Sequence, residues 1–179
     1  MQKYALLFTV LFTVCLVEAN AQCWIEKPVN KYDFELVGQA RPAGGGTDYV
    51  WIDQRAGKFD FETIGQARPA HGGTDWVWVE RKSGKWDMQT IGQARPNGGG
   101  INTTWIERKA GKYDMETIGK AEPNGGGISI VWIKKKVGKW DYEVVGRIRP
   151  NNNYDDCFST ENVAVAALLL FPDEYAAVE

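Results

Sequence analysis

The sequence predicts an all-β protein made of five 27-residue β-hairpin repeats in a closed or nearly closed antiparallel barrel or toroid. Three observations support this fold class: an uninterrupted 27-residue repeat, strand-like alternation of apolar residues within each unit, and two cysteines that bracket the array. The repeat is marked by a tryptophan at Trp24, Trp51, Trp78, Trp105 and Trp132. An open hairpin solenoid is the alternative architecture.

Residues 1–21 have the pattern of a secretory signal peptide. Lys3 precedes an apolar run over residues 5–17, and Ala19-Asn20-Ala21 has the small-residue pattern of a cleavage site. This apolar run is too short to span a membrane, and no second one follows. We therefore expect a secreted, extracellular protein with a five-repeat β domain over residues 22–150 and a C-terminal cap or tail over residues 151–179.

Each unit is predicted to form two strands. Residues 48–53 and 58–64 alternate in polarity, which is typical of half-buried strands, and place Phe59 and Phe61 on one face. The Ala56-Gly57 pair between them favours a type I turn with a left-handed residue and a G1 bulge.

The second connection, over residues 39–46 and its equivalents, contains proline and a run of glycines. It is either a plain turn between hairpins or a rim that contacts a ligand. No Lys-Ser/Thr follows the glycines and no helix pattern begins there, so the loop does not match a phosphate-binding loop.

Cys23 and Cys157 are the two cysteines that remain after the signal segment is removed. In an oxidising compartment they are expected to pair, and this disulfide favours closure because it brings the first and last units together. An intermolecular bond is the alternative. Closure would also remove the sheet edges.

The tail has six acidic residues and no Lys or Arg. Its apolar run over residues 162–171 predicts either a short helix capped by Thr160 or a final strand. Because the run is apolar nearly all round, we expect it to be buried as a plug or cap on the array.

Catalysis is not expected. The one histidine, His71, lies in a predicted loop, and no nucleophile–base spacing is present. Carboxylates such as Asp60 and Glu62 recur from unit to unit, whereas an active site needs one asymmetric environment. No metal or cofactor is predicted. A nucleic-acid partner is also not expected, because the array carries 20 Lys/Arg interleaved with 16 Asp/Glu.

Binding is the favoured function. Recurrent aromatic rings beside polar groups suit sugars, and five weak equivalent sites suit a repetitive polymer. The expected aromatic platforms are Trp51, Trp78, Trp105 and Trp132, although core packing would equally explain them. The expected polar anchors are Asp33, Asp60, Asp87, Asp114 and Asp141, together with Arg41, Arg68, Arg95 and Arg149. The Asp series has an alternative role in holding the hairpin turn, and Glu122 interrupts the Arg series, so the fourth site should differ or be lost.

These features predict a secreted, multivalent, lectin-like protein that recognises microbial or matrix glycans in defence, as a monomer or small oligomer. The alternative is a structural protein of an extracellular material such as a silk, coat or cement. Asn102-Thr103-Thr104 is an N-glycosylation sequon, and a glycan on Asn102 would obstruct a ligand at that loop.

Overall fold

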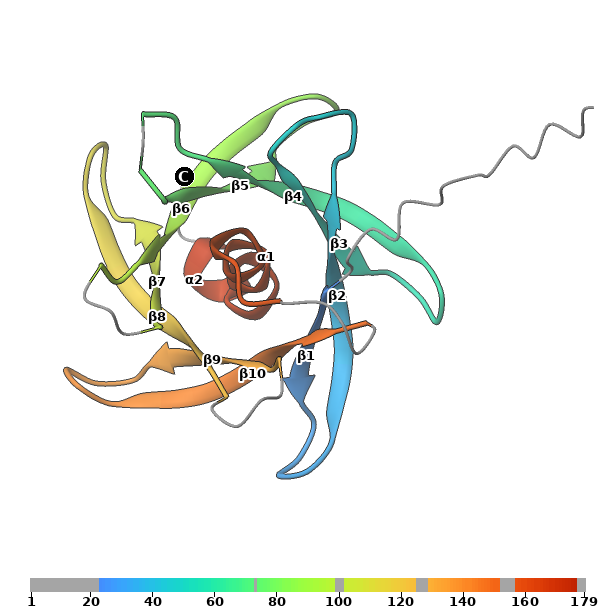
Figure 1. Cartoon of the computed structure of the whole chain (residues 1–179), viewed down its shortest axis with the longest axis vertical. Helices are drawn as coiled ribbons and strands as arrows, with labels where there is room; N and C mark the ends of the chain where they lie inside the picture. The colour runs from blue at the N-terminus through green and yellow to red at the C-terminus, as the bar shows by residue number, and fades with distance from the viewer. Residues whose placement is uncertain (1–22, 73, 99–101, 125–128, 152–156, 177–179) are drawn as a thin grey trace, which may run out of the picture.

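The structure is a computed structural model that describes residues 23–72, 74–98, 102–124, 129–151 and 157–176. The signal segment predicted over residues 1–21 lies outside the described residues. The described chain forms ten strands followed by two helices. Seen along its axis, the sheet is a ring from which five hairpins extend, with the helices inside it (Figure 1).

Every unit contributes one short and one long strand. The first strands have six residues each: β1 (Cys23–Pro28), β3 (Val50–Arg55), β5 (Val77–Lys82), β7 (Thr104–Lys109) and β9 (Val131–Lys136). The second strands have nine: β2 (Phe34–Pro42), β4 (Phe61–Pro69), β6 (Met88–Pro96), β8 (Met115–Pro123) and β10 (Tyr142–Pro150). All neighbours pair antiparallel, and β1 pairs with β10. The predicted closed barrel is confirmed, and the open solenoid is not observed.

The hairpin loops differ from the prediction. The backbone N–H of Ala56 donates to the carbonyl of Asp60 at 2.9 Å, so Phe59 lies in the loop and β4 begins only at Phe61. Gly57 has no positive φ. The predicted strand start at residue 58 and the left-handed turn residue are therefore wrong. Positive φ among the described residues is confined to glycines of the second type of connection: Gly44, Gly45, Gly46 and Gly72.

The glycine in four of the five hairpin loops leaves room for the carboxylate of the loop Asp. A Cβ on Gly57 would lie 3.1 Å from Oδ2 of Asp60, and the corresponding distances in the next three loops are 3.0, 3.2 and 2.9 Å. Asn30 takes this place in the first unit and donates from Nδ2 to Oδ2 of Asp33 at 2.6 Å. The recurrent Asp thus folds back under its own loop.

A β-bulge lies in the middle of the second strand of each hairpin. Ile52 is opposite Gly65, but Asp53 is opposite Thr63, so Ile64 is the extra residue. Ile64 is partly buried and packs against the core. The same register shift occurs in all five hairpins. The bulge lets two consecutive residues of the second strand face the lumen.

The core of the barrel is the helix α1 (Thr160–Leu170), which is followed by α2 (Pro172–Ala176). Residues 163–168 are all buried, so every face of α1 packs against the sheet. Lumen-facing side chains such as Ile25, Ile52 and Ile106 are fully buried around it. The tail is therefore a plug inside the ring, as its all-round apolar character predicts (Figure 1).

Five glycines, one per unit, make room both for a backbone carbonyl of the neighbouring strand and for the plug. A Cβ on any of them would lie within 3 Å of a side chain from the tail. The pairs are Gly38 with Leu169, Gly65 with Leu168, Gly92 with Tyr175, Gly119 with Phe171 and Gly146 with Leu170. The repeats therefore present the same notch five times, and the plug fills each notch with a different residue.

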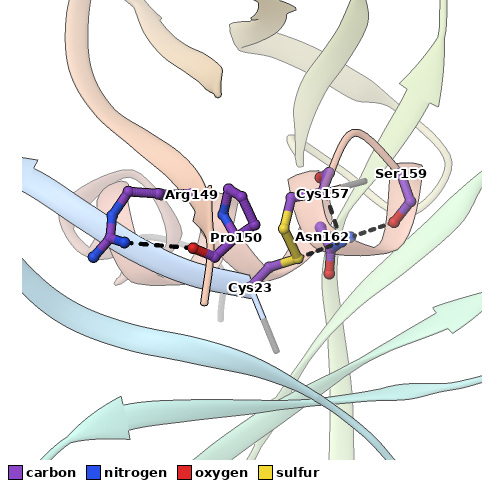
Figure 2. The surroundings of a disulfide bond; sticks show 6 residues. All are labelled: Cys23, Arg149, Pro150, Cys157, Ser159 and Asn162. Atoms are coloured by element: carbon purple, nitrogen blue, oxygen red, sulfur yellow. Dashed lines mark hydrogen bonds between the residues drawn. A yellow bond between two sulfur atoms is a disulfide. The ribbon is translucent and has the colours of Figure 1, made fainter. Parts of the chain in front are cut away.

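The disulfide between Cys23 and Cys157 ties the plug to the start of the barrel (Figure 2). The predicted pairing is confirmed. Ser159, not Thr160, caps the helix, because its side chain accepts a hydrogen bond from the N–H of Asn162 at 3.1 Å. The predicted cap was one residue too late. Asn162 also donates to the carbonyl of Cys157 at 3.3 Å, which joins the cap to the disulfide.

The two ends of the barrel are different. All five hairpin loops lie at one end, and the glycine-rich connections lie at the other, as the up-and-down strand order requires. Cys23 and Pro150 are register partners at the glycine-loop end. Among the residues that the structure describes, no helix has the length and apolar character needed to cross a bilayer.

Candidate functional site

The predicted tryptophans and arginines meet on the outer wall of the barrel. Arg41 on β2 is the register partner of Trp51 on β3, and the neighbouring residues Ala40 and Ile52 face the lumen. Arg68 with Trp78 and Arg95 with Trp105 repeat this pairing. Each tryptophan is partly buried, so it is neither a core residue nor freely exposed.

A carboxylate that sequence reasoning missed holds each arginine in place. Asp53 is only 3% exposed, and its Oδ2 accepts from Nε of Arg41 at 2.7 Å. Thr63 donates to Oδ1 of Asp53 at 2.7 Å, and Gln39 donates to Oδ2 at 3.4 Å. The signal was present, because an acid follows each tryptophan by two residues in the first four units.

We name these groupings the wall clusters. Each combines a Gln, an Arg, a Trp, a buried acid and a Thr from three successive strands. The first is Gln39, Arg41, Trp51, Asp53 and Thr63; the second is Gln66, Arg68, Trp78, Glu80 and Thr90; the third is Gln93, Arg95, Trp105, Glu107 and Thr117.

The buried acids are ionised by their partners. Burial opposes the charged form of Glu80, but hydrogen bonds from Arg68, Gln66 and Thr90 and the charge of Arg68 outweigh it, so the pKa of Glu80 is lowered. The pKa values of Asp53 and Glu107 are lowered in the same way. The hydrogen bonds that Arg68 donates to Glu80 in turn raise the pKa of Arg68. Each pair is therefore a fixed ionic unit.

The arginines keep one edge available. Nε and Nη2 make the hydrogen bonds of Arg41, Arg68 and Arg95 to their acids. Within the part of the chain that the structure describes, Nη1 of these three arginines makes no hydrogen bond. Their side chains are 35–39% exposed. Each of these arginines thus has a remaining donor, and its register partner on the next strand is a partly exposed tryptophan.

The fourth junction carries the reverse charges. Glu122 takes the arginine position, and its carboxylate lies 2.6 Å from Nζ of both Lys120 and Lys134. Lys134 takes the position of the buried acid, so the ion pair is preserved with its polarity exchanged. The site therefore differs from the first three, as the interruption of the Arg series predicts.

The junction that closes the barrel is different again. Glu26 pairs with Arg147 at 2.6 Å and with Arg149 at 3.0 Å. The guanidinium of Arg149 lies over the ring of Trp24, 4.7 Å from its centroid, and Nη1 donates to the carbonyl of Pro150. At this junction Arg149 covers the indole ring of Trp24, and its Nη1 is already hydrogen-bonded to Pro150.

The Asp series is not part of the wall clusters. Asp33, Asp60 and their equivalents lie in the hairpin loops, at the opposite end from the Trp–Arg pairs. The hydrogen bond between Asn30 and Asp33 supports the turn-holding role of this series. Their predicted part in ligand binding stays a prediction, without a wall tryptophan beside them.

The glycine-loop end has shallow hollows between its loops. One of about 450 Å³ is lined by Trp76, Asp75 and Glu161, and another of about 380 Å³ includes Asn102. Asn102 is exposed, so a glycan on it would occupy this second hollow. A separate hollow of about 470 Å³ lies towards the hairpin end, between β4, β5 and the plug.

Among the described residues, no group of three or more His, Cys, Asp or Glu is placed to hold a metal ion. Comparison of the chain with protein-family models, curated proteins and solved structures found no match. The class of protein is therefore argued from the fold and the wall clusters alone.

Proposed function

We propose that the protein is a secreted, multivalent carbohydrate-binding protein of lectin-like type, and that the first three wall clusters are its binding sites. The observation that carries this proposal is the register pairing of a partly exposed tryptophan with an arginine whose Nη1 donates no hydrogen bond to any residue that the structure describes. The C–H face of a sugar packs on an indole ring, while its hydroxyls accept hydrogen bonds from the guanidinium.

Preorganisation supports the same role. The buried acid fixes the arginine before a ligand arrives, so little side-chain entropy is lost on binding. Glu80, for example, receives hydrogen bonds from Gln66, Arg68 and Thr90. A sugar that met this cluster would find its donor already oriented beside Trp78.

Repetition supports a polymeric ligand, microbial or matrix in origin. Three like clusters on consecutive parts of the wall would engage a repetitive glycan, whose avidity can exceed a single affinity by about 10²–10⁴-fold. The reversed charges around Glu122 and the covered ring of Trp24 exclude the last two junctions from this set. The expected valence is therefore three, not five.

A secreted location fits the signal-like segment over residues 1–21 and the disulfide between Cys23 and Cys157. The alternative, a structural protein of an extracellular material, has less support. All ten strands are paired on both sides, so the described sheet offers no edge to which another copy could add.

A glycan array probed with the oxidised mature chain tests the proposal, with tryptophan fluorescence read during titration of any hit. The decisive variant is Arg41→Lys, Arg68→Lys and Arg95→Lys combined, which keeps the charge and removes the fixed Nη1 edge. The matched control is Arg149→Lys, whose Nη1 already serves Pro150.

We expect the triple variant to lose on the order of 100-fold in apparent affinity for a polymeric glycan, and the control to bind as the parent does. Thermal melting checks that both remain folded. A folded parent that binds no glycan, or a triple variant that binds as tightly as the control, would contradict the proposal.

A further inference from the structure

Five aromatic side chains at the hairpin tips are almost fully exposed. Each lies in a hairpin loop, and its exposed fraction is about four fifths: Tyr32 79%, Phe59 80%, Trp86 84%, Tyr113 85% and Trp140 80%. Large aromatic rings are normally at least partly buried, as the wall tryptophans of the same units are. Exposure at all five tips therefore calls for a partner.

A lysine precedes every one of these rings. Its Nζ lies 5.2–5.7 Å from the ring centroid in all five loops. We name the set the tip ring; its members are Lys31-Tyr32, Lys58-Phe59, Lys85-Trp86, Lys112-Tyr113 and Lys139-Trp140. Strand lengths and register are the same in every unit, so the five pairs lie at one level around the barrel axis.

The two ends of the barrel carry opposite charge. The hairpin end, residues 27–35, 54–62, 81–89, 108–116 and 135–143, has thirteen Lys/Arg and nine Asp/Glu, a net charge of +4. Asp173 and Glu174 of α2 reduce this to +2. The glycine-rich connections over residues 43–49, 70–76, 97–103 and 124–130 have two acids and no Lys or Arg. Such a distribution orients the hairpin end towards a negative surface.

The tip aromatics vary in type while the lysines do not. Tyrosine, phenylalanine and tryptophan all occur at the tips, whereas the wall position is tryptophan in every unit. A shaped ligand site needs one ring geometry, as the wall provides. The tip ring instead keeps amphipathic bulk beside a cation, which is the combination favoured at a lipid headgroup interface.

We propose that the tip ring docks the protein on the surface of an anionic lipid bilayer. The rings enter the headgroup region, and the lysine ammonium groups lie at the level of the lipid phosphates. A flat surface is the partner that all five coplanar tips contact at once. The inference does not depend on the wall clusters, which lie nearer the other end of the barrel.

Co-sedimentation of the oxidised mature chain with vesicles tests this docking. The vesicles are phosphatidylcholine alone, or phosphatidylcholine with about 30% phosphatidylglycerol as the anionic lipid. We expect binding to the anionic vesicles, weakened at least tenfold by a rise from low to physiological salt, and a blue shift of tryptophan emission. Absence of binding, or equal binding to both vesicle types, overturns the proposal.

Two variants locate the contact. Replacement of all five tip lysines by glutamine should reduce binding on the order of a thousandfold, since each lysine near an anionic surface contributes about fivefold. Trp86→Ser with Trp140→Ser should abolish the blue shift. Both tryptophans are exposed, so the fold should tolerate their loss.

Trp76→Ser is the matched control, because Trp76 is also exposed, at 39%, but lies at the glycine-loop end. It should leave binding and the blue shift unchanged. Binding to a soluble polyanion such as dextran sulfate is measured as the final comparison. If the polyanion binds the chain as tightly as the vesicles do and is equally sensitive to the tip tryptophans, the partner is an anionic polymer and the bilayer proposal fails.

Discussion

The ring of Tyr175 occupies the space left by the missing side chain of Gly92. A Cβ on Gly92 would lie 2.8 Å from Cε1 of Tyr175, and the Tyr175 hydroxyl donates to the backbone carbonyl of Glu107 at 3.3 Å. Complete burial raises the pKa of Tyr175, so the hydroxyl stays a donor. The side chain of Glu107 belongs to the third wall cluster. One residue thus joins the plug in the lumen to the candidate site outside.

Gly92→Ala should destabilise the protein by about 2 kcal/mol, because the added methyl group overpacks the notch against both Tyr175 and backbone. Gly98→Ala is the control, since a Cβ there meets nothing within 4 Å and its φ is not positive. Its effect should stay within about 0.5 kcal/mol. Urea unfolding measures both variants, and equal stability of the two would contradict the notch.

Exchanging the charges of Glu122 and Lys134 together should cost less stability than changing Glu122 alone. Glu122→Arg alone places a third cation beside Lys120 and Lys134, and should cost about 1 kcal/mol or more. Adding Lys134→Glu recreates the arrangement of the other junctions and should recover most of that loss. A double-mutant cycle on unfolding free energies measures the coupling. Additive effects of the two changes would rule out the exchange.

Stability should fall in acid as the buried carboxylates of the wall clusters become protonated. The folded pKa values of Asp53, Glu80 and Glu107 are lowered, so their contribution is complete above the ordinary carboxyl pKa of about 4. It is lost as the pH drops through the folded values. Glu80→Gln with Glu107→Gln should give a shallower dependence of melting temperature on pH below about 4. An unchanged slope would place the acid sensitivity elsewhere.

Loss of the disulfide should loosen the plug. Cys23→Ser with Cys157→Ser opens a bridge between residues 134 apart, which the chain-entropy model values at about 4–5 kcal/mol. We expect a large drop in the urea midpoint and faster proteolysis of the whole chain. Ser83→Ala, in an exposed hairpin loop, is a control for a small surface change. A midpoint unaffected by removal of the bridge would mean that packing of α1 alone holds the plug.

Repetition made the architecture readable from the sequence. A fixed 27-residue period, with Trp24 to Trp132 in register, implies equivalent hairpins, and a cysteine at each end implies closure. The details of the hairpin loop were not readable in the same way. Gly57 suggests a left-handed residue from its type alone, whereas the structure uses it to make room for the carboxylate of Asp60. A glycine that avoids a steric clash and a glycine that adopts a positive φ cannot be distinguished from the sequence alone.

The candidate site was only half predicted. Trp51 and Arg41 were both named as site residues because both recur, but their pairing follows only from the strand register. Asp53 was overlooked, although an acid recurs two residues after the tryptophan in the first four units. Strand register decides which polar residues share the outer wall, and the bulge at Ile64 shifts that register by one. Asp60 was named as a polar anchor because it recurs, with a turn-holding role as the alternative, and it lies in the hairpin loop. Its place in the loop follows only from the three-dimensional pairing.

The order of the chain sets a constraint on how the barrel is made. Most of the strands contact α1, yet α1 follows all ten of them in the chain. Before α1 is made, the ten strands have no helix to pack against. The closing pair of β1 with β10 also joins segments more than a hundred residues apart. Such non-local pairing is intrinsically slow. We therefore expect the barrel to close only after α1 has been synthesised, with α1 as the template around which the strands assemble.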